Sequence, residues 1–119
     1  MLKKEQFDKA VKYLTELEKF TKKLNDKYQI RDNEMIFYHV YDDDTPFRIN
    51  PDTLISYQIT RNFDYGCIED KVWCLNVYTD EYIDNTVKQT VVRYNASNID
   101  ELWSNYVNGK ARNQEVQNL

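Results

Sequence analysis

Apolar residues near the start of the chain recur at alternating three- and four-residue steps, which is the period of an α-helix with one buried face. This stripe consists of Phe7, Ala10, Leu14, Leu17, Leu24 and Tyr28, with Thr21 in one position. A coiled coil uses the same spacing, but roughly three heptads with a threonine in the seam form a short run for one. We therefore predict a helix at about residues 3–28 that docks on a sheet of the same chain.

After Asn33 the apolar period shortens to two residues, as in strands. The pattern predicts strands at residues 35–41, 54–61, 72–79 and 86–94, each bounded by acidic or Asn-containing turns. In the second strand apolar Ile55, Tyr57 and Ile59 alternate with polar Ser56, Gln58 and Thr60. Such alternation is typical of an antiparallel sheet that is covered on one side. Residues 46–49 leave open a fifth, edge strand.

A second helix is predicted from Asn98, whose side chain can cap the backbone N–H of Glu101. Its apolar face is formed by Ile99, Leu102, Trp103, Tyr106 and Val107. Gly109 can end it in a left-handed conformation. The sequence thus predicts an α+β fold in two layers, with an N-terminal amphipathic helix, a four- or five-stranded antiparallel sheet and a C-terminal helix. We expect one domain at residues 1–109 and a polar C-terminal tail at 110–119.

The composition agrees with one globular domain. The chain has 119 residues, of which 41% are hydrophobic, including ten tyrosines and five phenylalanines. A chain of this size can form a hydrophobic core without stabilising disulfides or metal ions. Two glycines and two prolines argue against glycine-rich phosphate loops and flexible linkers. No apolar run approaches the length of a membrane span. We expect a cytoplasmic protein, in a bacterial or host cell, that does not enter membranes.

Charge is unevenly distributed along the chain. Between Arg31 and Asp84 twelve acidic residues stand against four basic ones, whereas the preceding residues carry eight lysines and five acids. Several of those lysines lie three or four positions from acids, as on an ordinary solvated helix face. With a pI near 5.0 and no clustered arginines, we expect no direct nucleic-acid binding.

The acids of the middle segment fall in the predicted strand connections. In a plain four-strand meander the first and third connections share one end of the sheet, which gives an acidic rim. If residues 46–49 form a strand, the turn that carries Asp42 to Asp44 instead lies at the same end of the sheet as Asp64, Glu69 and Asp70. Aspartate is also common in turns for purely local reasons, because its side chain hydrogen-bonds to the nearby backbone and its charge keeps strand edges soluble. Neighbouring tyrosines favour a binding surface, because they supply large contact area at low entropic cost. The predicted partner-binding residues are Asp42, Asp43, Asp44, Asp80, Glu81, Asp84, Tyr41, Phe47 and Tyr82.

No catalytic, metal or cofactor signature stands out. The Asp42 to Asp44 triplet lacks the central glycine of a calcium loop before Pro46, so we expect neither metal nor cofactor. His39 could pair as a base with Cys67 or Cys74, but a hydrogen-bonded, half-buried histidine is the more ordinary interpretation. If Asp70 and Lys71 formed a hairpin turn, Cys67 would lie across from Cys74 and a disulfide would be conceivable. In a reducing cytosol two buried thiols are favoured.

In composition and architecture, without any specific motif, the chain resembles small acidic α+β proteins that bacteria and phages use as stoichiometric inhibitors. These include anti-restriction, anti-CRISPR and toxin immunity proteins, and the resemblance assigns no residue. We predict a non-catalytic inhibitor or adaptor whose acidic rim binds a basic protein partner such as a nucleic-acid-handling enzyme, as a monomer or homodimer. The alternatives are a toxin immunity protein, a homo-oligomeric structural or regulatory component, and a small ligand-binding domain.

Overall fold

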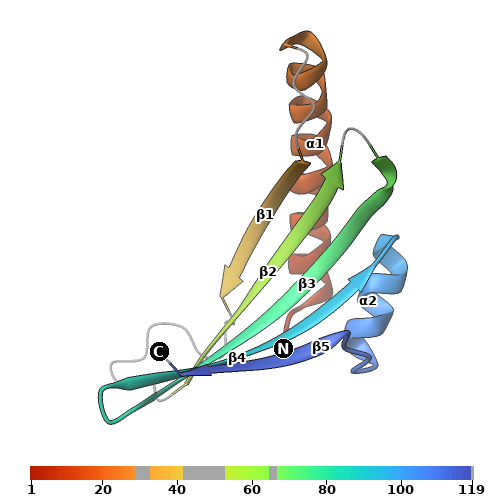
Figure 1. Ribbon diagram of the computed structural model, residues 1–119. Helices are drawn as coiled ribbons and strands as arrows, with labels where there is room; N and C mark the ends of the chain where they lie inside the picture. The colour runs from red at the N-terminus through yellow and green to blue at the C-terminus, as the bar shows by residue number, and fades with distance from the viewer. Residues whose placement is uncertain (29–32, 42–52, 65–66, 119) are drawn as a thin grey trace.

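The computed structural model describes residues 1–28, 33–41, 53–64 and 67–118. These residues form two helices and five strands in the order α1 (Lys4–Tyr28), β1 (Asn33–Tyr41), β2 (Thr53–Asp64), β3 (Cys67–Ile83), β4 (Thr86–Ala96), α2 (Ile99–Val107) and β5 (Asn113–Asn118) (Figure 1). The five strands form one antiparallel sheet. The predicted α+β fold is confirmed, and each predicted helix and strand is present with somewhat different ends.

The strands lie in the sheet in their sequence order, so each pairs with its neighbour in the chain. The register places Ile59 of β2 between Tyr38 and Leu75, and Leu75 pairs onward with Tyr94. Since partners in a ladder point to the same side, these apolar side chains share one face. Sequence alternation and strand register therefore agree on which face is buried.

Both helices lie on that apolar face (Figure 1). Helix α1 packs over β1 and β2, while α2 packs over β3 and β4. The two helices meet where the rings of Phe7 and Trp103 lie 5.0 Å apart between centroids. The backbone N–H of Leu2 donates to the buried Tyr106 hydroxyl at 2.9 Å. The core is made by Leu2, Phe7, Ala10, Val11, Leu14, Ile36, Tyr57, Ile59, Trp73, Leu75, Tyr94, Leu102 and Tyr106.

The ends of α2 follow the predicted capping pattern. The Asn98 side chain accepts a 2.8 Å hydrogen bond from the backbone N–H of Glu101. At the other end Gly109 has φ of 67°, and the Lys110 N–H donates to the carbonyl of Asn105 at 2.8 Å. This left-handed glycine with its wrapped-back hydrogen bond stops the helix.

The hairpin turn considered at Asp70 and Lys71 does not form, because both residues lie inside the long strand β3. Strand β2 continues to Asp64, which pairs with Cys67, so the chain reverses earlier than the charged pair indicated. Cys67 and Cys74 are consequently seven residues apart in one strand, about 23 Å at strand geometry. A disulfide between them is excluded.

Residues 110–119 were expected to form a polar tail, but the structure places Asn113–Asn118 in edge strand β5, paired with β4. All six residues are exposed. The strand is held through its backbone, beginning with the Arg112 N–H donating to the Arg93 carbonyl at 2.7 Å. A strand without buried side chains leaves no hydrophobic period in the sequence, which is why the pattern gave no indication of β5. The edge strand considered at 46–49 lies outside the described residues.

Candidate functional site

The sheet face that the helices leave uncovered is mostly polar, although it also carries Leu54 and the buried Val91. It carries the alternate positions of the strands, including Ser56, Gln58 and Thr60 of β2, Cys74, Asn76 and Tyr78 of β3, and Gln89, Arg93 and Asn95 of β4. The sequence predicted the polar character of β2 on this side. We refer to it as the open face.

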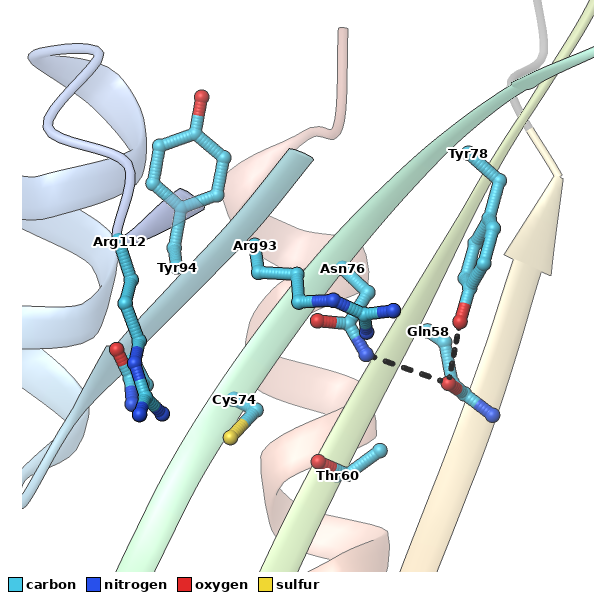
Figure 2. Close-up of a pocket in the computed structure, with 9 residues that line it drawn as sticks. Gln58, Thr60, Cys74, Asn76, Tyr78, Arg93, Tyr94 and Arg112 are labelled. Atoms are coloured by element: carbon cyan, nitrogen blue, oxygen red, sulfur yellow. Dashed lines mark hydrogen bonds between the residues drawn. The ribbon is translucent and has the colours of Figure 1, made fainter. Parts of the chain in front are cut away.

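A hydrogen-bonded cluster lies at the centre of the open face. The side-chain carbonyl of Gln58 accepts from the Tyr78 hydroxyl at 3.1 Å and from the Asn76 amide at 3.4 Å (Figure 2). Thr60 is only 3% exposed and Asn76 only 8%. Buried polar side chains on a face without a helix indicate a hollowed surface, where longer neighbours shield the centre from water.

The open face contains two adjoining hollows that share Gln58 and Tyr78. The first has a volume of about 360 Å³ and is lined in addition by Thr60, Cys74, Asn76, Arg93, Tyr94, Asn95 and Arg112. The second has a volume of about 240 Å³ and is lined in addition by His39, Tyr41, Leu54, Ser56, Asp80 and Gln89. We call the first the arginine hollow and the second the histidine hollow.

The two hollows differ in charge. Two arginines and no carboxylate line the arginine hollow. The histidine hollow contains Asp80, whose carboxylate accepts from the Gln89 amide at 3.0 Å. In that hollow the His39 ring packs edge-on against Tyr41 at 5.0 Å between centroids. One end of the open face therefore suits anions, and the other is acidic and aromatic.

The predicted acidic rim is only partly described. Tyr41, Asp80 and Tyr82 share the open face, as the ladder from Tyr41 through Ser56 to Tyr78 fixes. Glu81 points to the opposite side, where it pairs with Lys88 across the hairpin. The remaining predicted members Asp42, Asp43, Asp44 and Phe47 lie outside the described residues.

Asp84 occupies the tip of the β3–β4 hairpin, which extends beyond both helices (Figure 1). Asp84 and Asn85 have φ of 47° and 65°, the left-handed pair of a two-residue type I′ turn. Just before the turn Tyr82 is 44% exposed and Ile83 is 54% exposed. We call Glu81 to Asn85 the hairpin tip. It combines uncovered apolar area with two carboxylates.

His39 and Cys74 do not form a nucleophile–base pair. His39 is on β1 and Cys74 on β3, with β2 between them, so their backbones are roughly 10 Å apart across the sheet alone. His39 is exposed, contrary to the half-buried position considered for it. Among the residues whose side chains are described, no three His, Cys, Asp or Glu residues gather in a way that could hold a metal ion.

Sequence reasoning missed the arginine hollow. A signal was available for Arg93 and Asn95, which continue the polar alternation of the fourth strand. None was available for Arg112, because its place beside Arg93 depends on the unpredicted strand β5.

Comparison with protein-family models, with curated proteins and with solved structures found no match for this chain. Neither helix of the described part of the chain is long and apolar enough to cross a bilayer.

Proposed function

We propose that this protein is a non-catalytic inhibitor or adaptor of bacterial or phage type that binds a basic protein partner, such as a nucleic-acid-handling enzyme, through the hairpin tip and the adjoining acidic end of the open face. The observation that carries the proposal is the exposure of Tyr82 and Ile83 between Glu81 and Asp84 on a hairpin that extends past both helices.

The tip has the composition of a small protein contact. Tyr82 and Ile83 supply apolar area that can be desolvated against a partner, and aromatic residues are enriched among binding hot spots. Asp80, Glu81 and Asp84 outnumber the single base Lys88 in this part of the hairpin. Such an imbalance speeds association with a basic surface and makes it sensitive to salt.

The proposed binding surface extends from the hairpin tip along the open face. Tyr41 is 55% exposed and lies on the same face as Tyr82 and Asp80. A partner on the tip would therefore contact the histidine hollow as well. The rim residues Asp42, Asp43 and Asp44 follow Tyr41 directly in the chain and are included in the proposal on their sequence position.

The test is capture of proteins from a bacterial lysate on the immobilised protein, across a salt series. The wild type is compared with Tyr82→Ser, with Glu81→Gln combined with Asp84→Asn, and with Asp42, Asp43 and Asp44 changed to Asn. We expect Tyr82→Ser to lower capture of a basic protein at every salt concentration, and the charge variants to lower it mainly at low salt.

The matched control variants carry the same kinds of substitution on another part of the surface. Val107→Ser alters an exposed apolar residue of α2, and Asp100→Asn removes an exposed charge there. Capture that is the same for the wild type and every tip and rim variant would refute the proposed surface. A captured toxin would instead assign the protein to the toxin immunity class.

Strand β5 favours a second candidate, a homo-oligomeric structural or regulatory component. It lies at one edge of the sheet, with all six residues exposed and Glu115 as its only charge. Edge strands of monomeric proteins usually carry lysine, proline or a bulge that prevents further pairing. Two copies could join their β5 strands into a continuous sheet.

A further inference from the structure

We propose that the arginine hollow binds the phosphate group of a small phosphorylated sugar or polyol. This site lies in the other hollow of the open face from the acidic surface proposed for protein binding, and it does not depend on that proposal. It concerns Arg93, Arg112 and the uncharged polar residues between them.

The charge of the hollow is opposite to that of the whole chain. The protein carries a formal net charge of −4, yet the lining includes two arginines and no carboxylate. Arg112 forms no ion pair with any described residue. Arginine recognises phosphate through paired, charge-assisted hydrogen bonds, and two guanidinium groups suit a dianionic phosphate monoester better than a single carboxylate.

Among the described residues, Arg93 has one competing partner. Its Nη2 lies 3.4 Å from the carboxylate of Glu115, and the two side chains are 36% and 48% exposed. A pair this long and this exposed contributes little. A guanidinium has five N–H donors, so Arg93 can keep this contact and still donate to a ligand.

The floor of the hollow offers groups that match hydroxyls. The Gln58 carbonyl already accepts two hydrogen bonds, and its amide nitrogen points away from Arg93 and Cys74 in Figure 2, so Gln58 fixes the floor rather than donating to a ligand. Thr60 and Asn95 offer a hydroxyl and an amide. Figure 2 shows Arg112 and Thr60 on opposite sides of Cys74, while the Arg93 side chain lies further along the strands and runs toward Asn76. Charged donors at the rim and neutral donors and acceptors inside fit a phosphate joined to a polyhydroxylated body.

Size and surroundings limit the ligand further. A volume of about 360 Å³ is at the small end of ligand pockets, which span roughly 300–1,000 Å³. Glu115 lies beside the hollow and Asp80 lines the adjoining one. These carboxylates would repel the phosphates that extend from either side of a bound nucleotide in a nucleic acid. A compact phosphate monoester avoids them.

The free thiol of Cys74 lines the hollow and is half-buried, which makes it a local reporter. With Cys67 changed to Ser, Cys74 is the only thiol of the chain. The experiment measures the rate of Cys74 alkylation by iodoacetamide as ribose 5-phosphate, ribose or inorganic phosphate is added. We expect ribose 5-phosphate to slow alkylation severalfold, inorganic phosphate to do so at higher concentration, and ribose to have no effect.

Variants then test the arginines by titration calorimetry with ribose 5-phosphate. Arg112→Gln alters an exposed side chain and is expected to weaken binding about tenfold, the loss of one charge-assisted hydrogen bond. Arg93→Gln is expected to do the same. Lys110→Gln removes a nearby exposed charge that does not line the hollow and is expected to change affinity less than about twofold. Circular dichroism verifies that each variant is folded.

Three results would overturn the proposal. Equal protection by ribose and ribose 5-phosphate would show that phosphate is not recognised. An equal loss of affinity in Lys110→Gln and Arg112→Gln would reduce the effect to general electrostatics. Absence of binding and of protection up to about 10 mM ligand would exclude a specific site.

Discussion

The guanidinium of Arg61 lies between the carboxylate of Glu18 and the indole ring of Trp73. Its Nε is 3.2 Å from the Glu18 oxygen, and its Cζ is 4.8 Å from the Trp73 ring centroid. The contacts join helix α1 to strands β2 and β3. The two charged side chains are only 11% and 18% exposed. Both groups have therefore lost most of their contact with water, and each depends on the other for electrostatic stabilisation.

Removing one partner of this pair should destabilise the fold, because it leaves the other charge in a poorly solvated position. We expect Glu18→Gln to lower the free energy of unfolding by about 2–3 kcal/mol. Glu18→Gln combined with Arg61→Met should cost less than the sum of the single changes. Urea unfolding measures both. The control Glu16→Gln breaks an exposed pair with Lys19 and should cost less than about 0.5 kcal/mol; equal losses at both sites would contradict the prediction.

The hairpin tip should respond to backbone preference at Asn85, whose φ is 65°. Asn85→Gly should raise stability by a few tenths of a kcal/mol, to about 1 kcal/mol at most. Asn85→Val should lower it by about 1–2 kcal/mol, because a β-branched residue is strained there. Thermal unfolding measures both. Asp84→Asn keeps the turn preference and should be close to neutral, which makes it a clean charge variant for partner capture.

Tyr106→Phe should cost about 1–3 kcal/mol. The ring would keep its edge-on contacts with Tyr57 and Tyr94, but the buried N–H of Leu2 would lose its acceptor. Chemical denaturation of Tyr106→Phe beside Tyr82→Phe, which removes a hydroxyl from an exposed ring, separates the two effects. A Tyr106→Phe protein as stable as Tyr82→Phe would mean that the hydrogen bond contributes nothing.

If β5 mediates self-association, the molecular mass measured by light scattering should rise with protein concentration. Gln114→Lys combined with Gln117→Lys should keep the protein monomeric, since lysine on an edge strand opposes further pairing. Ser97→Lys combined with Ser104→Lys adds the same charge at exposed positions outside the strands and should leave association unchanged. A wild type that stays monomeric at all concentrations would remove the homo-oligomer candidate.

Periodicity in the sequence predicted the elements whose side chains are buried. Phe7, Ala10 and Leu14 of α1 and Ile59 of β2 are almost fully buried, so their spacing records the face they pack on. Strand β5 has no buried side chain, and nothing in its composition distinguishes it from a tail. A turn at Asp70 and Lys71 could be considered because charged residues in a strand resemble those of a turn, whereas the structure places both residues in β3.

The candidate site was predictable only in outline. Alternation placed Gln58 on an uncovered face, and the acids near Tyr82 were noted from the sequence alone. The hollows depend on register, because Arg93 and Arg112 are brought together by backbone pairing of β4 with β5. Without an alignment of strands, two arginines nineteen positions apart give no indication that they line one surface.

The contact of Leu2 with Tyr106 joins positions 104 residues apart, so it can form only late in translation of the chain. Strands β1 to β4 can pair with their neighbours as they leave the ribosome, since each contact is local. Helix α1 is made first but gains its contact with Trp103 only when α2 has emerged. During translation its apolar face therefore has an incomplete cover, and closure of the core waits for nearly the whole chain.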